Sequence, residues 1–195
     1  MHPRRRKGLI QILVGVIVLL VVIGLYSFEG GQSDRVVSTF AECAGAGHSV
    51  MESYPRRCKS PDGKTFREDI GNELEKDDLI RIEHPRPNSV VISPLAIRGM
   101  ARGSWFFEAS FPVFVVDGNG NIIGQGVAQA QGNKATGEAH WMTEDFVPFA
   151  ATITLDTAHI QGRYSNHGTL ILKKDNPSDN HERDDALEIP IQFGK

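Results

Sequence analysis

The sequence predicts an all-β protein: an antiparallel β-sandwich of about seven strands, preceded by an N-terminal transmembrane helix and a small disulfide-stapled segment. Three observations support this prediction. Residues 79–195 alternate short β-rich runs with turn residues and show no long amphipathic helical pattern. Residues 8–26 are apolar and uncharged. The two cysteines, Cys43 and Cys58, both follow that apolar run.

Charge is divided unevenly along the 195 residues. Four basic residues fall in the head, residues 1–7, and no acidic residue precedes Glu29. Without those four, the 21 basic residues fall to 17 against 24 acidic ones, a net charge of −7. A nucleic-acid-binding protein would carry the opposite balance, so no nucleic-acid partner is expected.

The apolar run of residues 8–26 predicts a membrane-spanning helix. At about 1.5 Å per residue, a helix of that length nearly crosses a hydrocarbon core of about 30 Å. The basic head should stay cytoplasmic by the positive-inside rule, which places the rest of the chain outside. The expected localisation is therefore the cell membrane, with a single pass, a cytoplasmic N-terminus and an extracytoplasmic C-terminal domain.

A cleaved signal peptide is the alternative for this run, and it stays open. Its apolar core would usually span about 7–15 residues and end at a small-residue cleavage site. The run here is longer, and the sequence after it, Leu25-Tyr26-Ser27-Phe28, lacks that site. Both interpretations export the rest of the chain, which continues through a polar tether over residues 27–39.

Residues 40–70 form a two-cysteine motif. In an oxidising compartment, an even number of cysteines favours a disulfide, here between Cys43 and Cys58. On the chain-entropy model, closing a loop of about 15 residues contributes about 3 kcal/mol. A metal site would need more ligands than these cysteines and His48 supply, and the spacing is not the C-x-x-C of a redox pair. A structural staple is the favoured interpretation.

The C-terminal domain follows a polar, charged segment, residues 71–78, which predicts a hinge. Gly118-Asn119-Gly120 separates two β-rich runs and predicts a hairpin. The runs that predict strands are residues 79–84, 89–92, 95–101, 107–117, 121–130, 149–156, 168–174 and 187–193.

The aromatic residues before and within residues 107–117 alternate in sequence. Trp105, Phe107 and Phe111 share one parity, so at least one of their rings should reach the core. Phe106 and Phe114 share the other parity. Because both parities are apolar, the strand is predicted to be central or covered on both faces.

A set of short motifs in this domain resembles a known family. They are Ser93-Pro94-Leu95, Gly99, residues 101–108, Phe111-Pro112-Val113, Asp117 with Gly120, Trp141-Met142-Thr143, residues 146–149, Gly168-Thr169-Leu170 and residues 175–178.

In this order the motifs are similar to the immunoglobulin-like domain of bacterial spore germination, the second of the GerM-associated domains. The resemblance covers roughly Ile80 to Phe193. It implies an exported immunoglobulin-like β-sandwich, often joined to other envelope modules, with spore germination as one setting. The partner domain of the GerM type is absent from this sequence.

The candidate binding surface lies around this aromatic stretch. Its residues are Arg102, Trp105, Phe106, Glu108 and Trp141. In one interpretation they form an exposed aromatic platform that binds a ligand. In the other, which is favoured, the aromatic rings belong to the core and the two charged residues pin a loop.

The sequence marks no catalytic residue, metal site or cofactor site. Residues 117–121 resemble the opening of a calcium loop, but Ile122 and Ala128 replace the glycine and glutamate such a loop needs. Residues 47–51 fail the spacing of a nucleophile elbow, and residues 181–185 lack the second histidine of a zinc peptidase. The acidic residues of 175–188 predict a solvated loop, or else a weak site for Ca²⁺ or a cationic polymer.

These features favour a membrane-anchored binding or scaffolding module of the bacterial cell envelope. Its expected partners are the membrane, through residues 8–26, and an envelope protein or polymer. The alternative is an accessory domain of an envelope enzyme, or an unrecognised hydrolase. A cleft with converging histidines and carboxylates would favour that alternative, and a closed sandwich with a filled core would favour binding.

Overall fold

A computed structural model describes residues 37–132, 140–156, 166–178 and 180–194. No helix within these ranges is long and apolar enough to cross a membrane. The predicted basic head, the transmembrane helix over residues 8–26 and most of the tether lie outside the described residues. Apart from residues 37 and 38, the described residues belong to one compact unit, Thr39–Lys195.

The two-cysteine motif folds as a short helix and a small antiparallel sheet. Thr39 caps α2 (Phe40–Gly45) in a capping box with Glu42, which satisfies free backbone N–H groups at the helix start. Its strands are β1 (Ser49–Met51), β2 (Arg57–Lys59) and β3 (Thr65–Arg67), in the order β1-β2-β3.

The predicted disulfide is confirmed. Cys43 of α2 is bonded to Cys58 of β2, and both side chains are fully buried. Neither cysteine belongs to the hydrophobic core of the sandwich, so the bond staples a separate, small core. A segment of this size buries little apolar surface, which is why a covalent link matters for its stability.

The segment predicted as a hinge is docked on the sandwich. It contains a one-turn helix, α3 (Glu73–Lys76). Asn72 exchanges backbone and side-chain hydrogen bonds with Glu188 and Ala186 at 2.8–3.1 Å. Gly71 adopts a φ of +67°, and a Cβ there would collide with the carbonyl oxygen of Glu188. The close backbone approach therefore requires glycine.

In the described residues eight strands build the sandwich, where about seven were predicted, and each β-rich run of the sequence overlaps one of them. They are β4 (Ile80–His84), β5 (Val90–Val91), β6 (Leu95–Arg102), β7 (Ser110–Asp117), β8 (Ile122–Ala130), β9 (Phe146–Ile153), β10 (His167–Lys173) and β11 (Ala186–Phe193). Their hydrogen-bonded order is β4-β6-β9-β8-β7-β10-β11-β5. The described pairs are antiparallel except β5 with β11, which is parallel.

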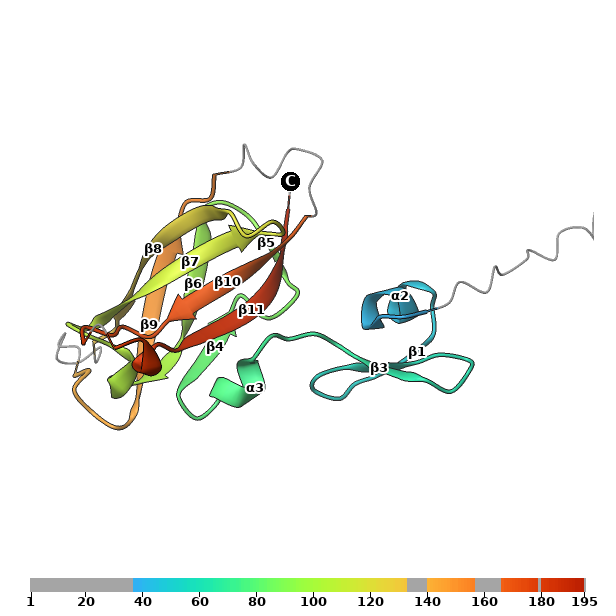
Figure 1. The fold of residues 1–195 in the computed structure, drawn as a ribbon, viewed down its shortest axis with the longest axis horizontal. Helices are drawn as coiled ribbons and strands as arrows, with labels where there is room; N and C mark the ends of the chain where they lie inside the picture. The colour runs from blue at the N-terminus through green and yellow to red at the C-terminus, as the bar shows by residue number, and fades with distance from the viewer. Residues whose placement is uncertain (1–36, 133–139, 157–165, 179, 195) are drawn as a thin grey trace, which may run out of the picture. The chain divides into compact units, whose positions relative to one another are not determined.

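The strands form two layers (Figure 1). One layer holds β4, β6 and β9, and the other holds β7, β10, β11 and β5. β8 pairs with β7 along most of its length, but with β9 only at Gln129 and Ala130. This strand therefore joins the layers at one end, and the eight strands form a single hydrogen-bonded sheet folded on itself.

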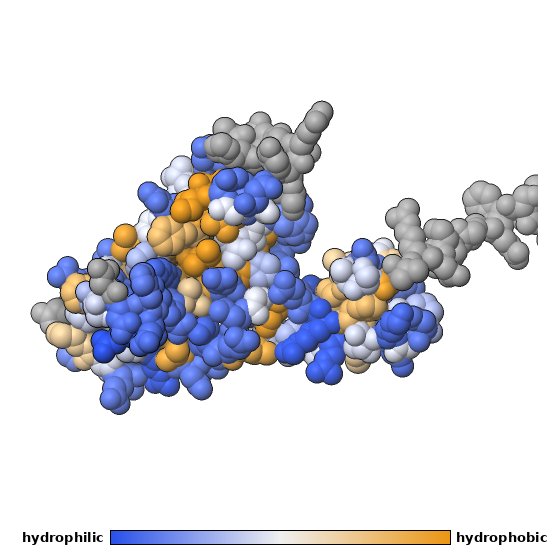
Figure 2. Space-filling model, viewed as in Figure 1, coloured by the Kyte–Doolittle hydropathy of each residue, from blue (hydrophilic) through white to orange (hydrophobic). Residues whose placement is uncertain are grey.

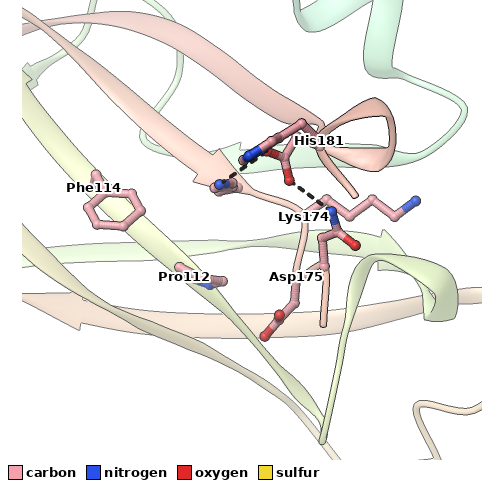
Figure 3. Close-up of a pocket in the computed structure, with 8 residues that line it drawn as sticks. Pro112, Phe114, Lys174, Asp175 and His181 are labelled. Atoms are coloured by element: carbon pink, nitrogen blue, oxygen red, sulfur yellow. Dashed lines mark hydrogen bonds and ion pairs between the residues drawn. The ribbon is translucent and has the colours of Figure 1, made fainter. Parts of the chain in front are cut away.

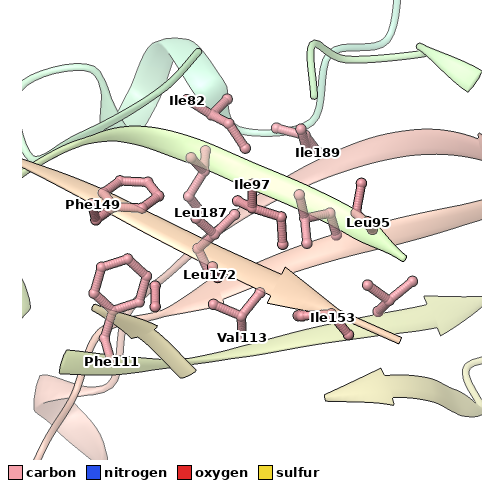
Figure 4. Packing of buried hydrophobic residues seen from close by; sticks show 14 of the residues in the cluster. Ile82, Leu95, Ile97, Phe111, Val113, Phe149, Ile153, Leu172, Leu187 and Ile189 are labelled. Carbon is pink, nitrogen blue, oxygen red and sulfur yellow. The ribbon is translucent and has the colours of Figure 1, made fainter. Parts of the chain in front are cut away.

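The core lies between the layers, where buried side chains from alternate positions meet (Figure 4). Ile97 and Phe149 come from one layer, and Phe111, Leu172 and Ile189 from the other. The Phe111 and Phe149 rings meet nearly edge to face, with centroids 5.0 Å apart. Such pairs add about 0.5–1.5 kcal/mol beyond the burial of their surface.

The predicted β7–β8 hairpin is present. The Asp117 carboxylate accepts hydrogen bonds from the backbone N–H groups of Asn119 and Asn121, at 2.8 and 2.9 Å, and from the Asn121 side chain at 2.9 Å. These bonds, that of the Asn121 side chain foremost, lower the pKa of Asp117. Gly120 adopts a φ of +84°, which glycine tolerates best. Residues 117–121 therefore form the turn of the hairpin.

The prediction that Trp105, Phe107 and Phe111 share one face of a strand is wrong. Trp105 lies in a 3₁₀ turn, η1 (Gly103–Trp105), and β7 begins only at Ser110. Between them Glu108 adopts a φ of +48°, which breaks the two-residue period. Trp105 and Phe111 are buried, whereas Phe107 is 42% exposed. The central position predicted for the strand is confirmed, because β7 lies between β8 and β10.

We expect Trp105→Ala in the Thr39–Lys195 unit to lower the free energy of unfolding by about 3–5 kcal/mol, as large-to-small core changes do. Urea unfolding measures this. Phe107→Ala is the matched control, and its more exposed ring predicts a clearly smaller loss. A Trp105→Ala midpoint as little changed as that of a surface variant would contradict the core position of this ring.

Candidate functional site

On the sheet of β7, β8, β10 and β11, the face that points away from the core carries apolar side chains among polar ones such as Gln125 and Thr169. Its side chains alternate with the buried ones, and cross-strand register places them side by side, as with Phe114 opposite Ile171 and Pro112 opposite Val127. Figure 2 shows apolar side chains gathered over these strands. We call this the outer apolar face; its residues are Pro112, Phe114, Val116, Ile122, Val127, Ile171 and Pro190.

A recess of about 240 Å³ opens at one end of this face (Figure 3). Pro112 and Phe114 of β7 supply its apolar wall. The polar wall comes from residues 173–176, at the end of β10, and from His181 and Asp184, at the 3₁₀ turn η2 (His181–Arg183). The fold thus brings together an aromatic ring and charged groups that lie some 60 residues apart in the sequence.

Hydrogen bonds fix the polar wall. The Asp184 carboxylate accepts a hydrogen bond from Asn176 at 2.9 Å and contacts His181 Nδ1 at 3.2 Å. These two contacts, that of Asn176 foremost, lower the pKa of Asp184. The backbone N–H of Asp175 donates to the carbonyl oxygen of Trp105 at 3.1 Å, which ties the loop to η1. The predicted solvated loop is therefore an ordered rim where it is described.

The recess combines an apolar ring with polar groups of both signs. Lys173 and Lys174 offer ammonium donors, and Asp175 offers a carboxylate. This composition suits non-covalent recognition of a polypeptide or polymer segment, in which ring contacts supply affinity and polar groups fix orientation. In the described ranges, no three or more His, Cys, Asp or Glu side chains lie together as a metal site would need.

The structure buries two of the five residues that the sequence predicted as a binding surface. The rings of Trp105 and Phe106 are 1% and 5% exposed and lie in the core. Arg102 stacks over the Phe146 ring at 4.1 Å and donates hydrogen bonds to two backbone carbonyls, those of Asp78 and Glu144. The two aromatic rings are thus packing residues.

The other two predicted surface residues lie at the same end of the fold. Glu108 is exposed in the turn before β7. Trp141 is partly buried and packs against the core. The carbonyl oxygens of Trp141 and Thr143 come so close to Gly103 that a Cβ there would collide with both. A binding role for Arg102, Glu108 and Trp141 stays a prediction.

Sequence reasoning missed the recess, although one signal for it was visible. Phe114 and Val116 are apolar, although they lie on the opposite face of β7 from the core residues. This pattern predicted that both faces of the strand are covered. That second face is partly covered by the rim that Asp175 and His181 form, and no local pattern predicts such a long-range contact.

A family model described as the immunoglobulin-like domain of bacterial spore germination matches residues 79–180, more than half of the chain. The chain belongs to this family. The match of this immunoglobulin-like domain begins just before β4 and includes β10, whereas the two-cysteine motif lies outside it. No curated protein and no solved structure matches the chain.

A second charged cluster links the two-cysteine motif to the start of the immunoglobulin-like domain. Glu68 accepts two hydrogen bonds from the Arg56 guanidinium, at 2.9 and 2.6 Å, and one from Asn88 at 3.2 Å. The Arg56 bonds hold the pKa of Glu68 below its usual range. Glu73 pairs with Arg86 at 2.7 Å, but burial raises its pKa.

We expect Glu68→Gln to lower the free energy of unfolding at pH 7 by about 1–2 kcal/mol, because half-exposed Arg56 loses a charged hydrogen-bond partner. The pKa of Glu68 is lower in the folded than in the unfolded state. Its contribution is therefore present above the unfolded pKa of about 4.3 and is lost as the pH falls through the folded pKa.

Urea unfolding of both proteins from about pH 7 down to about pH 3 measures this, and the difference between them should shrink as the pH falls below about 4. Glu83→Gln, on the exposed side of β4, is the control and should change stability little. A Glu68→Gln difference that is the same at every pH would contradict the assigned role of the ionised carboxylate.

Proposed function

We propose that this chain is a membrane-anchored, extracytoplasmic immunoglobulin-like module of the bacterial cell envelope that binds or scaffolds another envelope component. The observation that carries the proposal is the Cys43–Cys58 disulfide, buried in a motif with little other core. Structural disulfides form in oxidising compartments and are rare in the cytosol. An exported location is the simplest setting for this bond.

The sequence of residues 1–26 supports the anchor. A basic head followed by an uncharged apolar run is the pattern of a single membrane span with a cytoplasmic N-terminus. The family, an immunoglobulin-like domain of bacterial spore germination, supports an envelope setting, and germination is one process in which the module would act.

The outer apolar face and its recess support binding as the activity. Val127 and Ile122 are 51% and 58% exposed there, beside the partly buried ring of Phe114. Large exposed apolar side chains gathered on one face of a sheet mark interaction sites in soluble domains. The core between the layers is filled and the recess lies outside it, which favours recognition of a protein or polymer over catalysis.

The topology is tested with the full chain carrying a tag after Lys195. Protease added to intact spheroplasts should remove the tag, because the C-terminal domain is expected outside the membrane. Cys43 and Cys58 should resist alkylation until a reductant is added. Retention of the tag in spheroplasts, with loss only after lysis, would contradict the orientation, and immediate alkylation of both thiols would contradict export.

Binding is tested by capture from envelope extract with the Thr39–Lys195 unit, comparing wild type with Phe114→Asp. The charge should reduce capture of the bound component by at least about tenfold, because burial of a phenylalanine ring is worth about 1.5–3 kcal/mol. Phe107→Asp, at an exposed ring outside the recess, should capture normally. Equal capture by wild type and Phe114→Asp, with matching melting temperatures, would exclude the recess as the site.

A further inference from the structure

The three-stranded sheet of the two-cysteine motif has one buried face and one open face. Cys58 is bonded to Cys43 of α2, so α2 covers the face that Cys58 shares with its cross-strand partners, Val50 and Phe66. Side chains one residue away point to the opposite face. The residues of that open face, all exposed, are Ser49, Met51, Arg57, Lys59, Thr65 and Arg67.

Three of these six residues are basic, and we call Arg57, Lys59 and Arg67 the basic face. Arg57 lies directly opposite Arg67 across β2 and β3, and Lys59 is two residues along β2 from Arg57. Like charges directly opposite one another destabilise a sheet. The arrangement therefore carries a cost to folding that a binding role would explain.

No ion pair joins a residue of the basic face to another described residue, whereas the neighbouring basic side chains are paired. Arg56 is bonded to Glu68, and Lys64 lies 2.9 Å from Asp62. The chain beyond its basic head has a net charge of −7, so this positive cluster runs against its surroundings. An anionic partner would complement it.

We propose that the basic face docks on the anionic phosphate headgroups of the membrane that holds the anchor. This rests on the proposed anchoring, since residues 27–39 are the only chain between residues 8–26 and the motif. Even fully extended, 13 residues span at most about 45 Å, which limits how far the motif can lie from the membrane surface. Exposed Met51 lies directly opposite Arg57 on this face, which suits an interface that is charged and partly apolar.

The attraction is expected to be additive over the three charges. Each lysine or arginine close to an anionic membrane surface strengthens binding about fivefold, so the three together supply a factor on the order of 100. Screening shortens the reach of the attraction to about 8 Å at physiological salt, so the contact depends on the tether that holds the two surfaces together.

Co-sedimentation of the Thr39–Lys195 unit with lipid vesicles at low ionic strength tests the proposal without using the anchor. Vesicles of phosphatidylcholine mixed with phosphatidylglycerol should bind the wild type, and vesicles of phosphatidylcholine alone should not. The triple variant Arg57→Gln, Lys59→Gln, Arg67→Gln should bind on the order of 100-fold more weakly. A control triple variant on the sandwich, Arg81→Gln, Arg98→Gln, Arg183→Gln, should bind as the wild type does.

Three results would overturn the proposal: equal binding to both kinds of vesicle, undiminished binding of the basic-face variant, or binding to soluble polyphosphate without binding to vesicles. The last would assign the face to a free anionic polymer. Urea unfolding guards against misfolding, and loss of the opposed charges should leave the midpoint unchanged or raised. If the triple variant unfolds, Arg67→Gln alone should weaken binding about fivefold. Failure of the anchor itself would appear separately, in the spheroplast experiment.

Discussion

The sandwich depends on β7, which carries apolar side chains on both of its faces. Toward the core, Phe111 meets Phe149 of the facing layer, and the buried residues of six other strands pack around that contact. Away from the core, Pro112 and Phe114 form the apolar wall of the recess. A strand at the centre of a layer is hydrogen-bonded to a neighbour on each side. The apolar wall of the recess therefore belongs to a rigid part of the fold.

Regular alternation made much of this fold predictable. Each β-rich run overlaps a strand, and the hairpin at Gly118-Asn119-Gly120 and the Cys43–Cys58 disulfide follow from turn chemistry and from cysteine count. The start of β7 was not predictable in the same way. Glu108 and Ala109 adopt left-handed conformations in a tight turn that two backbone hydrogen bonds between Phe107 and Ser110 close, and neither residue type is one that favours such a turn.

The candidate site was less predictable than the fold because it is assembled from distant segments. The aromatic motif that suggested a binding platform, Trp105 and Phe106, forms core, and the close packing of Gly103 against the Trp141 carbonyl brings two distant segments together. The recess instead needs His181 and Asp184 to fold back toward β7. Charge composition alone predicted a solvated loop there, because it carries no information about which strand a loop approaches.

The docking of the predicted hinge on β11 has a mechanical consequence. A pull from the N-terminal side of the chain would reach Asn72 before it reached β4. There it would meet the hydrogen bonds of Asn72 to Ala186 and Glu188, and then the ion pair of Lys76 with Asp185, at 2.6 Å. Tension would thus enter the sandwich through its last strand as well as its first, sharing the load between two layers rather than peeling β4 from the edge.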